Sequence, residues 1–134
     1  MHRNAGFTLI ELMITVAIVA LLAGVAYPSY RNQVLKSHRA EGKSTLMQVA
    51  QNLERCYTAT NPYVGCAPSP TQTTWPLTSE HGRYQISITS NATTYTLTAT
   101  PQAGQANDTR CMNLTLTETG AKNKSGTGTV RDCW

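Results

Sequence analysis

The strongest constraint on the fold of this chain is an apolar segment near its start that contains a single carboxylate. Residues 7–30 have the sequence FTLIELMITVAIVALLAGVAYPSY and follow a short polar segment, residues 1–6. At roughly 1.5 Å per residue, a helix over residues 7–27 is long enough to cross a bilayer. Glu11 lies inside it, although a carboxylate near the bilayer centre costs about 2.5–3.5 kcal/mol. We therefore expect a membrane helix in which Glu11 has a function.

Two simpler explanations of this segment are a cleaved secretory signal and a local helix cap. Residues 24–26 (Gly-Val-Ala) meet the small-residue requirement of a signal cleavage site, but the apolar segment is longer than the hydrophobic region of most signal peptides. Thr8 and Glu11 have the Thr-x-x-Glu spacing of a capping box. Such a cap does not explain the Gly6-Phe7 junction that precedes it.

Residues 6–13, with the sequence GFTLIELM, resemble the class III signal of type IV prepilins. The resemblance implies that prepilin peptidase cleaves after Gly6, so that residues 1–6 are a leader, and that the new Phe7 amine is N-methylated. It also implies that Glu11 serves assembly by meeting the Phe7 ammonium of a neighbouring subunit. The expected fold is then the type IV pilin fold.

Electrostatics supports this role for Glu11. A methylated amine stays cationic, so a Phe7 terminus in the apolar centre of a fibre needs an anion, and a buried Glu11 needs a cation. Pairing reduces both desolvation costs and can set the register between subunits. Pro28 is the second predicted assembly residue: it lacks a backbone donor and should kink the helix or start its second half. The resemblance implies that helicity near Pro28 can be lost on assembly.

After the predicted membrane and polymerisation helix, residues 7–30, the sequence predicts a head, residues 31–134, that begins with an amphipathic helix over residues 31–57. Apolar or small residues recur there at three- and four-residue steps. These are Val34 or Leu35, His38, Gly42, Leu46, Val49, Leu53 and Tyr57. We expect the other face to be solvated or to pack against other stems; it carries Arg31, Lys36, Arg39, Lys43 and Arg55, with Glu41 and Glu54.

The rest of the head predicts a loop followed by a sheet. Residues 58–82 are rich in proline and predict an ordered loop, the αβ-loop of pilins by resemblance, which Tyr63 and Trp75 could attach to the head. Residues 83–117 predict three strands with one apolar face each, and residues 121–124 a short fourth strand. The expected inward residues are Tyr84, Ile86, Ile88, Tyr95, Leu97, Ala99, Met112, Leu114 and Leu116. The fold class is therefore α+β, with a long helix packed on a 3–4-stranded antiparallel sheet.

Four cysteines in a chain of 134 residues, none in a Cys-x-x-Cys pair, predict two disulfides and an oxidising compartment. Three pairings are possible. Cys56 ends the helix and Cys66 lies in the following loop, so this pair would attach the loop to the helix. We expect Cys111 to face away from the core, where the polar segment ending in Cys133 can reach it. Two redox-active thiol pairs are the alternative.

The pair Cys111–Cys133 would close the segment that pilins call the D-region, residues 111–133. The final Cys133-Trp134 and the helix sequences at residues 39–41 and 51–57 resemble the PilE-type minor pilins. The resemblance implies a structural subunit, most simply a minor pilin, held in the inner membrane by one span and then assembled into an extracellular type IV pilus (a fimbrium). Its partners would be other pilin subunits, prepilin peptidase, the inner-membrane assembly machinery and inner-membrane lipid. It would support pilus biogenesis, twitching motility or cell adhesion.

Two other functions share the same N-terminal segment. A DNA-binding competence pilin would need a basic patch. Candidate cations for it are Arg83, Arg110, Lys122, Lys124 and Arg131, among which Lys122, Lys124 and Arg131 are the expected DNA contacts. Because no aromatic residue is interleaved with Lys122 and Lys124, and the net charge is only +4, scattered solubilising charge is the simpler interpretation. The other function is that of a type II secretion pseudopilin.

We expect neither an enzyme nor a cofactor or metal site. His2, His38 and His81 are far apart in the sequence, without acidic or cysteine neighbours at ligand spacing. The sequence has no nucleophile elbow and no glycine-rich phosphate loop.

Overall fold

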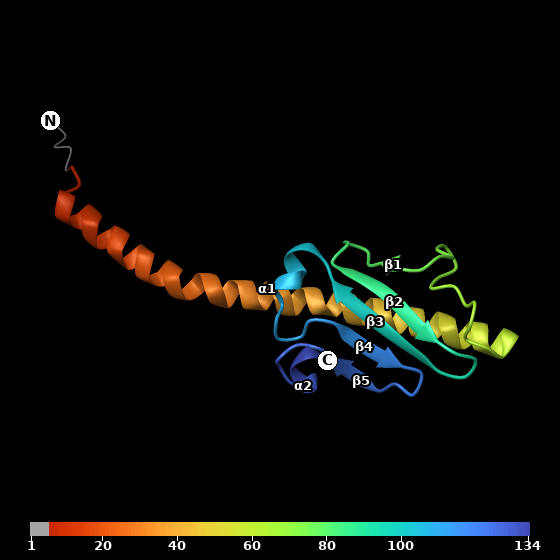
Figure 1. Ribbon diagram of the computed structural model, residues 1–134. Helices are drawn as coiled ribbons and strands as arrows, with labels where there is room; N and C mark the ends of the chain where they lie inside the picture. Colours follow the sequence, from red (N-terminus) through yellow and green to blue (C-terminus); the bar gives the residue numbers. More distant parts are fainter. Residues whose placement is uncertain (1–5) are drawn as a thin grey trace. The chain divides into compact units, whose positions relative to one another are not determined.

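The computed structural model describes residues 6–134, so the predicted leader, apart from Gly6, lies outside the described residues. The described chain forms two compact units, one ending at Val34 and the other spanning Leu35–Trp134. Both units contain part of α1, which runs from Leu9 to Thr60 (Figure 1).

α1 passes Pro28 without a break and ends three residues later than predicted. Its end is set by Asn61, whose φ of 64° is in the left-handed region that asparagine tolerates, while its N–H still bonds Tyr57 O at 2.8 Å. Residues 6–33 are exposed in the single chain. α1 contains a stretch that is long and apolar enough to cross a membrane.

The sheet of the second unit has five antiparallel strands in sequence order (Figure 1). The strands are β1 (Leu77–Thr78), β2 (Tyr84–Ser90), β3 (Tyr95–Pro101), β4 (Leu114–Thr117) and β5 (Lys122–Lys124). The prediction of a helix on an antiparallel sheet is confirmed, but the strand count was too low. β1 was missed inside the predicted loop because two residues are too few to show an alternation.

The core lies between one face of α1 and the sheet. Leu46, Val49 and Leu53 are fully or almost fully buried, as are the inward residues of β2 to β4 such as Ile86 and Leu97. Gly42 lets the helix approach the sheet closely, because a Cβ there would lie 3.0 Å from the ring of the buried Tyr84. The predicted core is thus mostly correct.

Two side chains of the predicted third strand differ from expectation. The strand begins at Leu114, and the preceding residues form a turn in which Met112 has a φ of 51° and donates to Asp108 O at 2.9 Å. Met112 is therefore exposed, and Cys111 is completely buried rather than facing away from the core. Alternation failed here because polar and apolar residues also alternate by chance in a turn.

Arg39 was also assigned to the wrong face of the helix. It was expected to be solvated, but its residue is only 7% exposed. Charged residues are rarely buried unless they are paired. The partner of Arg39 is Asp108, which follows the 3₁₀ helix η1 (Ala103–Asn107), far along the chain.

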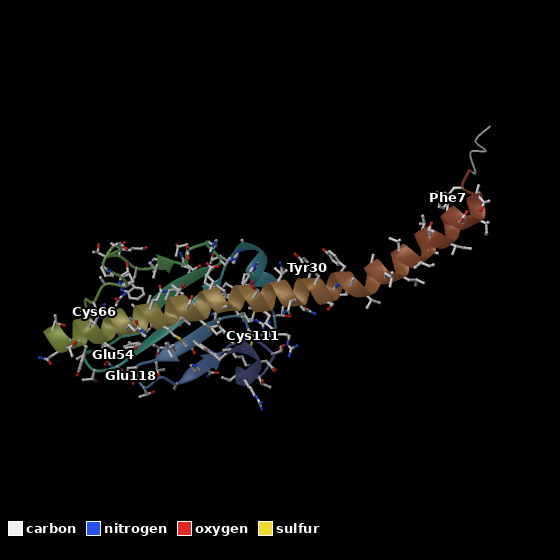
Figure 2. The ribbon with its side chains drawn as sticks, turned by 180° about the vertical axis from the view of Figure 1, so that it is seen from behind. Phe7, Tyr30, Glu54, Cys66, Cys111 and Glu118 are labelled. Carbon is white, nitrogen blue, oxygen red and sulfur yellow. A yellow bond between two sulfur atoms is a disulfide. The ribbon has the colours of Figure 1, made fainter. Side chains whose placement is uncertain are left out.

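The loop after α1 is fixed to the end of the helix. Cys66 is bonded to Cys56, and the Tyr63 hydroxyl donates to Glu54 at 3.0 Å. Figure 2 labels Cys66 and Glu54 near this end of α1. The Trp75 indole N–H donates to Cys66 O at 3.1 Å. Tyr63 is buried and Trp75 packs against the core, so both residues attach the loop to the head as predicted.

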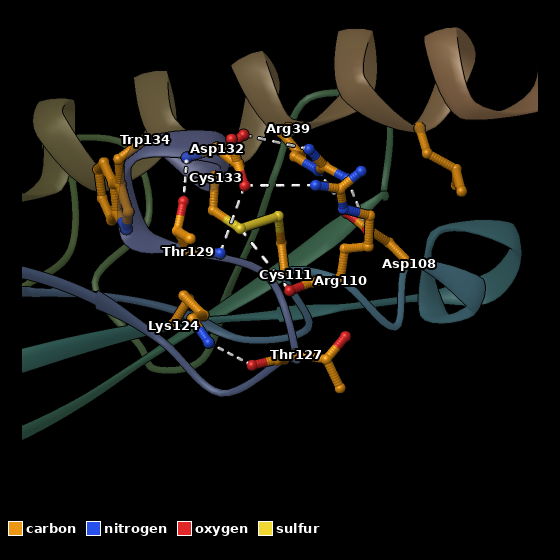
Figure 3. Close-up of a disulfide and its surroundings, with 12 residues drawn as sticks. Arg39, Asp108, Arg110, Cys111, Lys124, Thr127, Thr129, Asp132, Cys133 and Trp134 are labelled. Carbon is orange, nitrogen blue, oxygen red and sulfur yellow. Dashed lines mark hydrogen bonds and ion pairs between the residues drawn. A yellow bond between two sulfur atoms is a disulfide. The ribbon is translucent and has the colours of Figure 1, made fainter.

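The last part of the D-region, after β5, lies against the turn before β4 and ends in α2 (Val130–Cys133). Gly126 donates to Cys111 O at 3.1 Å, and a Cβ at Gly126 would overlap the Arg110 backbone. Cys133 in α2 is bonded to Cys111 (Figure 3). The glycine and the disulfide together hold this segment against the residues before β4.

Candidate functional site

Arg39 and Asp108 form a buried ion pair at the edge of the candidate site (Figure 3). Arg39 Nε donates to Asp108 Oδ2 at 2.6 Å, and Arg39 Nη2 donates to Asp108 Oδ1 at 2.8 Å. Two parallel charge-assisted bonds of this kind fix orientation as well as distance. Arg39 Nη1 also donates to the backbone oxygen of Asp132 at 3.3 Å. A single guanidinium thus joins α1, the segment after η1 and α2.

A groove of about 340 Å³ lies beside this pair, between α1 and α2. We call it the basic groove. Cations come from three parts of the chain that are remote in sequence. The lining residues are Lys36, Arg39, Lys43, Arg110, Arg131, Asp132 and Trp134. Asp108 neutralises Arg39, and Asp132 lies 3.3 Å from Arg110. Lys43 Nζ donates to Trp134 O at 3.4 Å, and Lys36 and Arg131 form no ion pair with a described residue.

The electrostatics of Lys43 reflects this gathering of positive charge. Partial burial lowers the pKa of Lys43, and the nearby charges of Arg39, Lys122 and Lys36 lower it further. The effect of Lys122 on Lys43 brings β5 into the same electrostatic neighbourhood. An anion in this groove would therefore meet several cations at once.

Trp134 borders the basic groove and contacts β5. The Lys122 ammonium lies 5.2 Å from the centre of its ring, and the indole N–H donates to Asn123 O at 2.8 Å. Such a cation–π contact places charge beside an aromatic face. No aromatic residue is interleaved with Lys122 and Lys124 in the sequence, but the fold brings Trp134 beside Lys122.

The basic residues predicted from the sequence fall into two groups. Arg110 and Arg131 line the basic groove, and Lys122 joins it through Trp134. Lys124 turns back to the backbone oxygen of Gly126. Arg83 is held by Glu41 at 2.8 Å and does not line the groove.

Sequence reasoning assigned two groove residues, Lys36 and Lys43, to a solvated helix face. Their spacing of seven residues, about two helical turns, already places them on one side of α1. What it could not indicate is that α2 and Arg110 lie opposite them.

Thr8 and Glu11 form the predicted capping box at the start of α1. Glu11 N donates to Thr8 Oγ1 at 3.3 Å, and Thr8 N reaches Glu11 Oε2 at 3.5 Å. The cap uses only Oε2; Glu11 Oε1 has no hydrogen-bond partner among residues 6–134. A cap and a contact with another subunit are therefore compatible.

Residues 6–134 contain no group of three or more His, Cys, Asp or Glu side chains suited to a metal ion. The groove instead offers guanidinium and ammonium donors, which suit phosphate or carboxylate groups.

The chain matches two known protein families. Residues 28–115 match the family described as "Type IV minor pilin ComP, DNA uptake sequence receptor", and residues 1–27 match the prokaryotic N-terminal methylation motif. The chain belongs to the type IV minor pilin ComP family. The resemblance to type IV pilins that the first residues indicated is thus confirmed.

Individual relatives match part of the chain. Type IV major fimbrial protein FimA of Dichelobacter nodosus is 47% identical over 53 residues, which are 37% of this chain and 33% of FimA. A second FimA from the same organism is 45% identical over 51 residues. The matched region is only about a third of the length of these relatives. A type IV pilin from Shewanella oneidensis has a TM-score of 0.47 and 23% identity, covering 66% of this chain and 89% of that one.

The chain is accordingly a type IV pilin subunit. The match to the methylation motif, residues 1–27, contains Gly6, Phe7 and Glu11 and the apolar first part of α1. Together with the fimbrial relatives, these features indicate a membrane-anchored precursor that becomes part of an extracellular pilus.

Proposed function

We propose that this chain is a minor pilin whose head binds DNA, and that it is displayed on the pilus for DNA uptake. The observation that carries the proposal is the basic groove with Trp134 at its edge, in a chain whose family is described as a DNA uptake sequence receptor. The competence alternative, less favoured by the sequence, thereby becomes the better-supported function of the head. Twitching motility, adhesion and a role as a secretion pseudopilin stay predictions.

The chemistry of the groove suits a nucleic-acid backbone. Each phosphate that Lys or Arg neutralises releases condensed counterions, which favours binding at low salt. Lys36, Arg110 and Arg131 are exposed, so a phosphate can reach them without disrupting the core. Lys122 beside Trp134 adds a cation next to an aromatic face, a combination that suits stacked bases or sugars.

The stem serves anchoring and assembly in this proposal. One span in the inner membrane holds the precursor, prepilin peptidase cleaves after Gly6, and Phe7 is N-methylated. Glu11 then pairs with the Phe7 ammonium of a neighbouring pilin, and Pro28 allows the helix to adapt in the fibre. Support comes from the methylation motif and from Glu11 Oε1, which accepts no hydrogen bond from any of residues 6–134.

The experiment compares two exposed arginines of equal charge. Arg131 lines the basic groove, whereas Arg55 lies near the end of α1, outside it. Neither side chain donates a hydrogen bond to a described residue. Purified full chain in neutral detergent micelles is titrated against a fluorescent DNA duplex, and anisotropy is followed over a range of salt.

Arg131→Gln should weaken binding and reduce the slope of log Kd against log salt by about 0.9, the loss of one phosphate contact. Arg55→Gln should bind DNA like the unchanged protein. Equal losses in both variants, or no binding by the unchanged protein, would contradict a DNA site in the basic groove.

A further inference from the structure

The basic groove contains one carboxylate that the proposed function does not need. Asp132 lines the groove among its cations, and its Oδ2 lies 3.3 Å from Arg110 Nη2 (Figure 3). A phosphate approaching Arg110 would therefore meet a negative charge already in place. Asp132 needs an explanation, since a groove built only to attract phosphate gains nothing from it.

The position of Asp132 is fixed from several sides. Its backbone N–H donates to Thr129 Oγ1 at 3.2 Å, and its carboxylate accepts from Thr129 N at 3.4 Å. Its backbone oxygen accepts from Arg39 Nη1 at 3.3 Å, and the next residue, Cys133, is bonded to Cys111. The carboxylate consequently cannot move away from the groove without breaking contacts of α2.

Asp132 is also charged under ordinary conditions. The hydrogen bonds from the Thr129 side chain and backbone lower the pKa of Asp132, and Arg110 lowers it further. The carboxylate therefore stays ionised at neutral pH and repels a phosphate nearby.

The ion pair itself is open to exchange. The Arg110 side chain is 63% exposed and that of Asp132 is 46% exposed, so solvent weakens their attraction. A phosphate that enters the groove competes with the Asp132 carboxylate for Arg110 Nη2. We propose that Asp132 is an internal competitor of the DNA backbone, which occupies Arg110 in the free protein and lowers the affinity for DNA that offers phosphates alone.

This inference rests on the proposed function and concerns how strongly phosphate contacts contribute to its DNA affinity. Phosphate contacts are the same for every sequence, whereas base contacts discriminate between sequences. The Asp132 charge weakens the phosphate contacts and so lowers the affinity for every DNA sequence equally. Base contacts then contribute a larger share of the affinity that remains.

The decisive variant is Asp132→Asn, which removes the charge and keeps a side-chain oxygen to accept from Thr129 N. Glu80→Gln is the matched control, because Glu80 is exposed, lies between β1 and β2, and does not line the groove. Both variants lose one negative charge. Full chain in neutral detergent micelles is titrated with a fluorescent duplex of arbitrary sequence over a range of salt.

Asp132→Asn should bind this duplex about two- to fivefold more tightly, the range expected for releasing an exposed ion pair. Its salt dependence should be steeper by about 0.9, since Arg110 becomes free to neutralise a phosphate. In an Arg110→Gln background, the same substitution should give a smaller gain. Intact-mass measurement of the Cys111–Cys133 disulfide shows that α2 is still in place.

A gain in Asp132→Asn no larger than that in Glu80→Gln, or a gain unaffected by Arg110→Gln, overturns the internal-competitor role while the unchanged protein still binds DNA. If neither the unchanged protein nor Asp132→Asn binds the duplex, the proposed function fails, and this inference fails with it.

Discussion

The carboxylate of Glu41, on α1, accepts hydrogen bonds from three groups between β1 and β2. Ser79 Oγ donates at 2.5 Å, His81 N at 2.9 Å and Arg83 Nη1 at 2.8 Å. Burial raises the pKa of Glu41, but these three bonds outweigh burial and lower the pKa from 4.5 to about 2. The ionised carboxylate therefore attaches the β1–β2 turn to the helix more strongly than the protonated form does.

Glu41 should make the free energy of unfolding depend on pH in the acid range. Because its pKa is lower in the folded state, its contribution is complete above the unfolded pKa, near 4.5, and is lost as the pH falls toward about 2. Glu41→Gln should be less stable at neutral pH and lose less stability between these two values. Urea unfolding at each pH, followed by the fluorescence of Trp75 and Trp134, measures this.

Glu80→Gln supplies the control for that measurement, since Glu80 is the neighbouring exposed carboxylate. It should keep the acid dependence of the unchanged protein. A Glu41→Gln variant with an undiminished acid dependence would show that the three hydrogen bonds do not govern this titration.

At the scale of elements, the two disulfides hold different parts of the head. Cys56–Cys66 attaches the loop after α1 to the helix end, whereas Cys111–Cys133 attaches α2 to the turn before β4. Only the second bridge lies beside the basic groove. The bridges should therefore be separable by function although both stabilise the head.

Replacing either cysteine pair by serine should lower the free energy of unfolding by roughly 3 kcal/mol in the chain-entropy model, because both closed loops are short. Loss of Cys111–Cys133 should also weaken DNA binding, since it frees α2 with Arg131. Loss of Cys56–Cys66 should leave DNA affinity unchanged. Urea unfolding and anisotropy on the same samples test both effects, and equal DNA binding by the two variants would contradict this assignment.

Sequence patterns predicted the long elements better than the short ones. β2 and β3 were located because seven residues each show a clear alternation, while β1 has two residues and shows none. The basic groove was harder to predict from the sequence, because its residues come from α1, the turn before β4, and α2. No local pattern indicates that Trp134 lies against Lys122, or that Arg39 finds Asp108, since both contacts depend on tertiary structure.

At the scale of the whole molecule, the residues proposed for assembly and those proposed for DNA binding belong to different units. Residues 6–33 are exposed in the single chain and largely apolar, while the basic groove belongs to the unit Leu35–Trp134. Variants can therefore be designed to affect one activity without the other.

Glu11→Ala should reduce incorporation into pili by tenfold or more, because the Phe7 ammonium of a neighbour would lose its partner in an apolar environment, at a cost of several kcal/mol. Quantitative mass spectrometry of sheared pili measures the fraction incorporated and detects the methylated Phe7. Thr8→Ala removes the local cap and keeps the Glu11 carboxylate, so it should assemble far better. Normal incorporation of Glu11→Ala would refute the proposed pairing.

The guanidinium of Arg39 has a mechanical consequence. It belongs to α1 and bonds both Asp108 and the backbone oxygen of Asp132, while Lys36 and Lys43 of the groove belong to α1 as well. An anion bound by Lys36 and Lys43 would therefore be held by α1 itself. Under the proposed function, force on bound DNA would reach the helix through these side chains without first passing through the sheet.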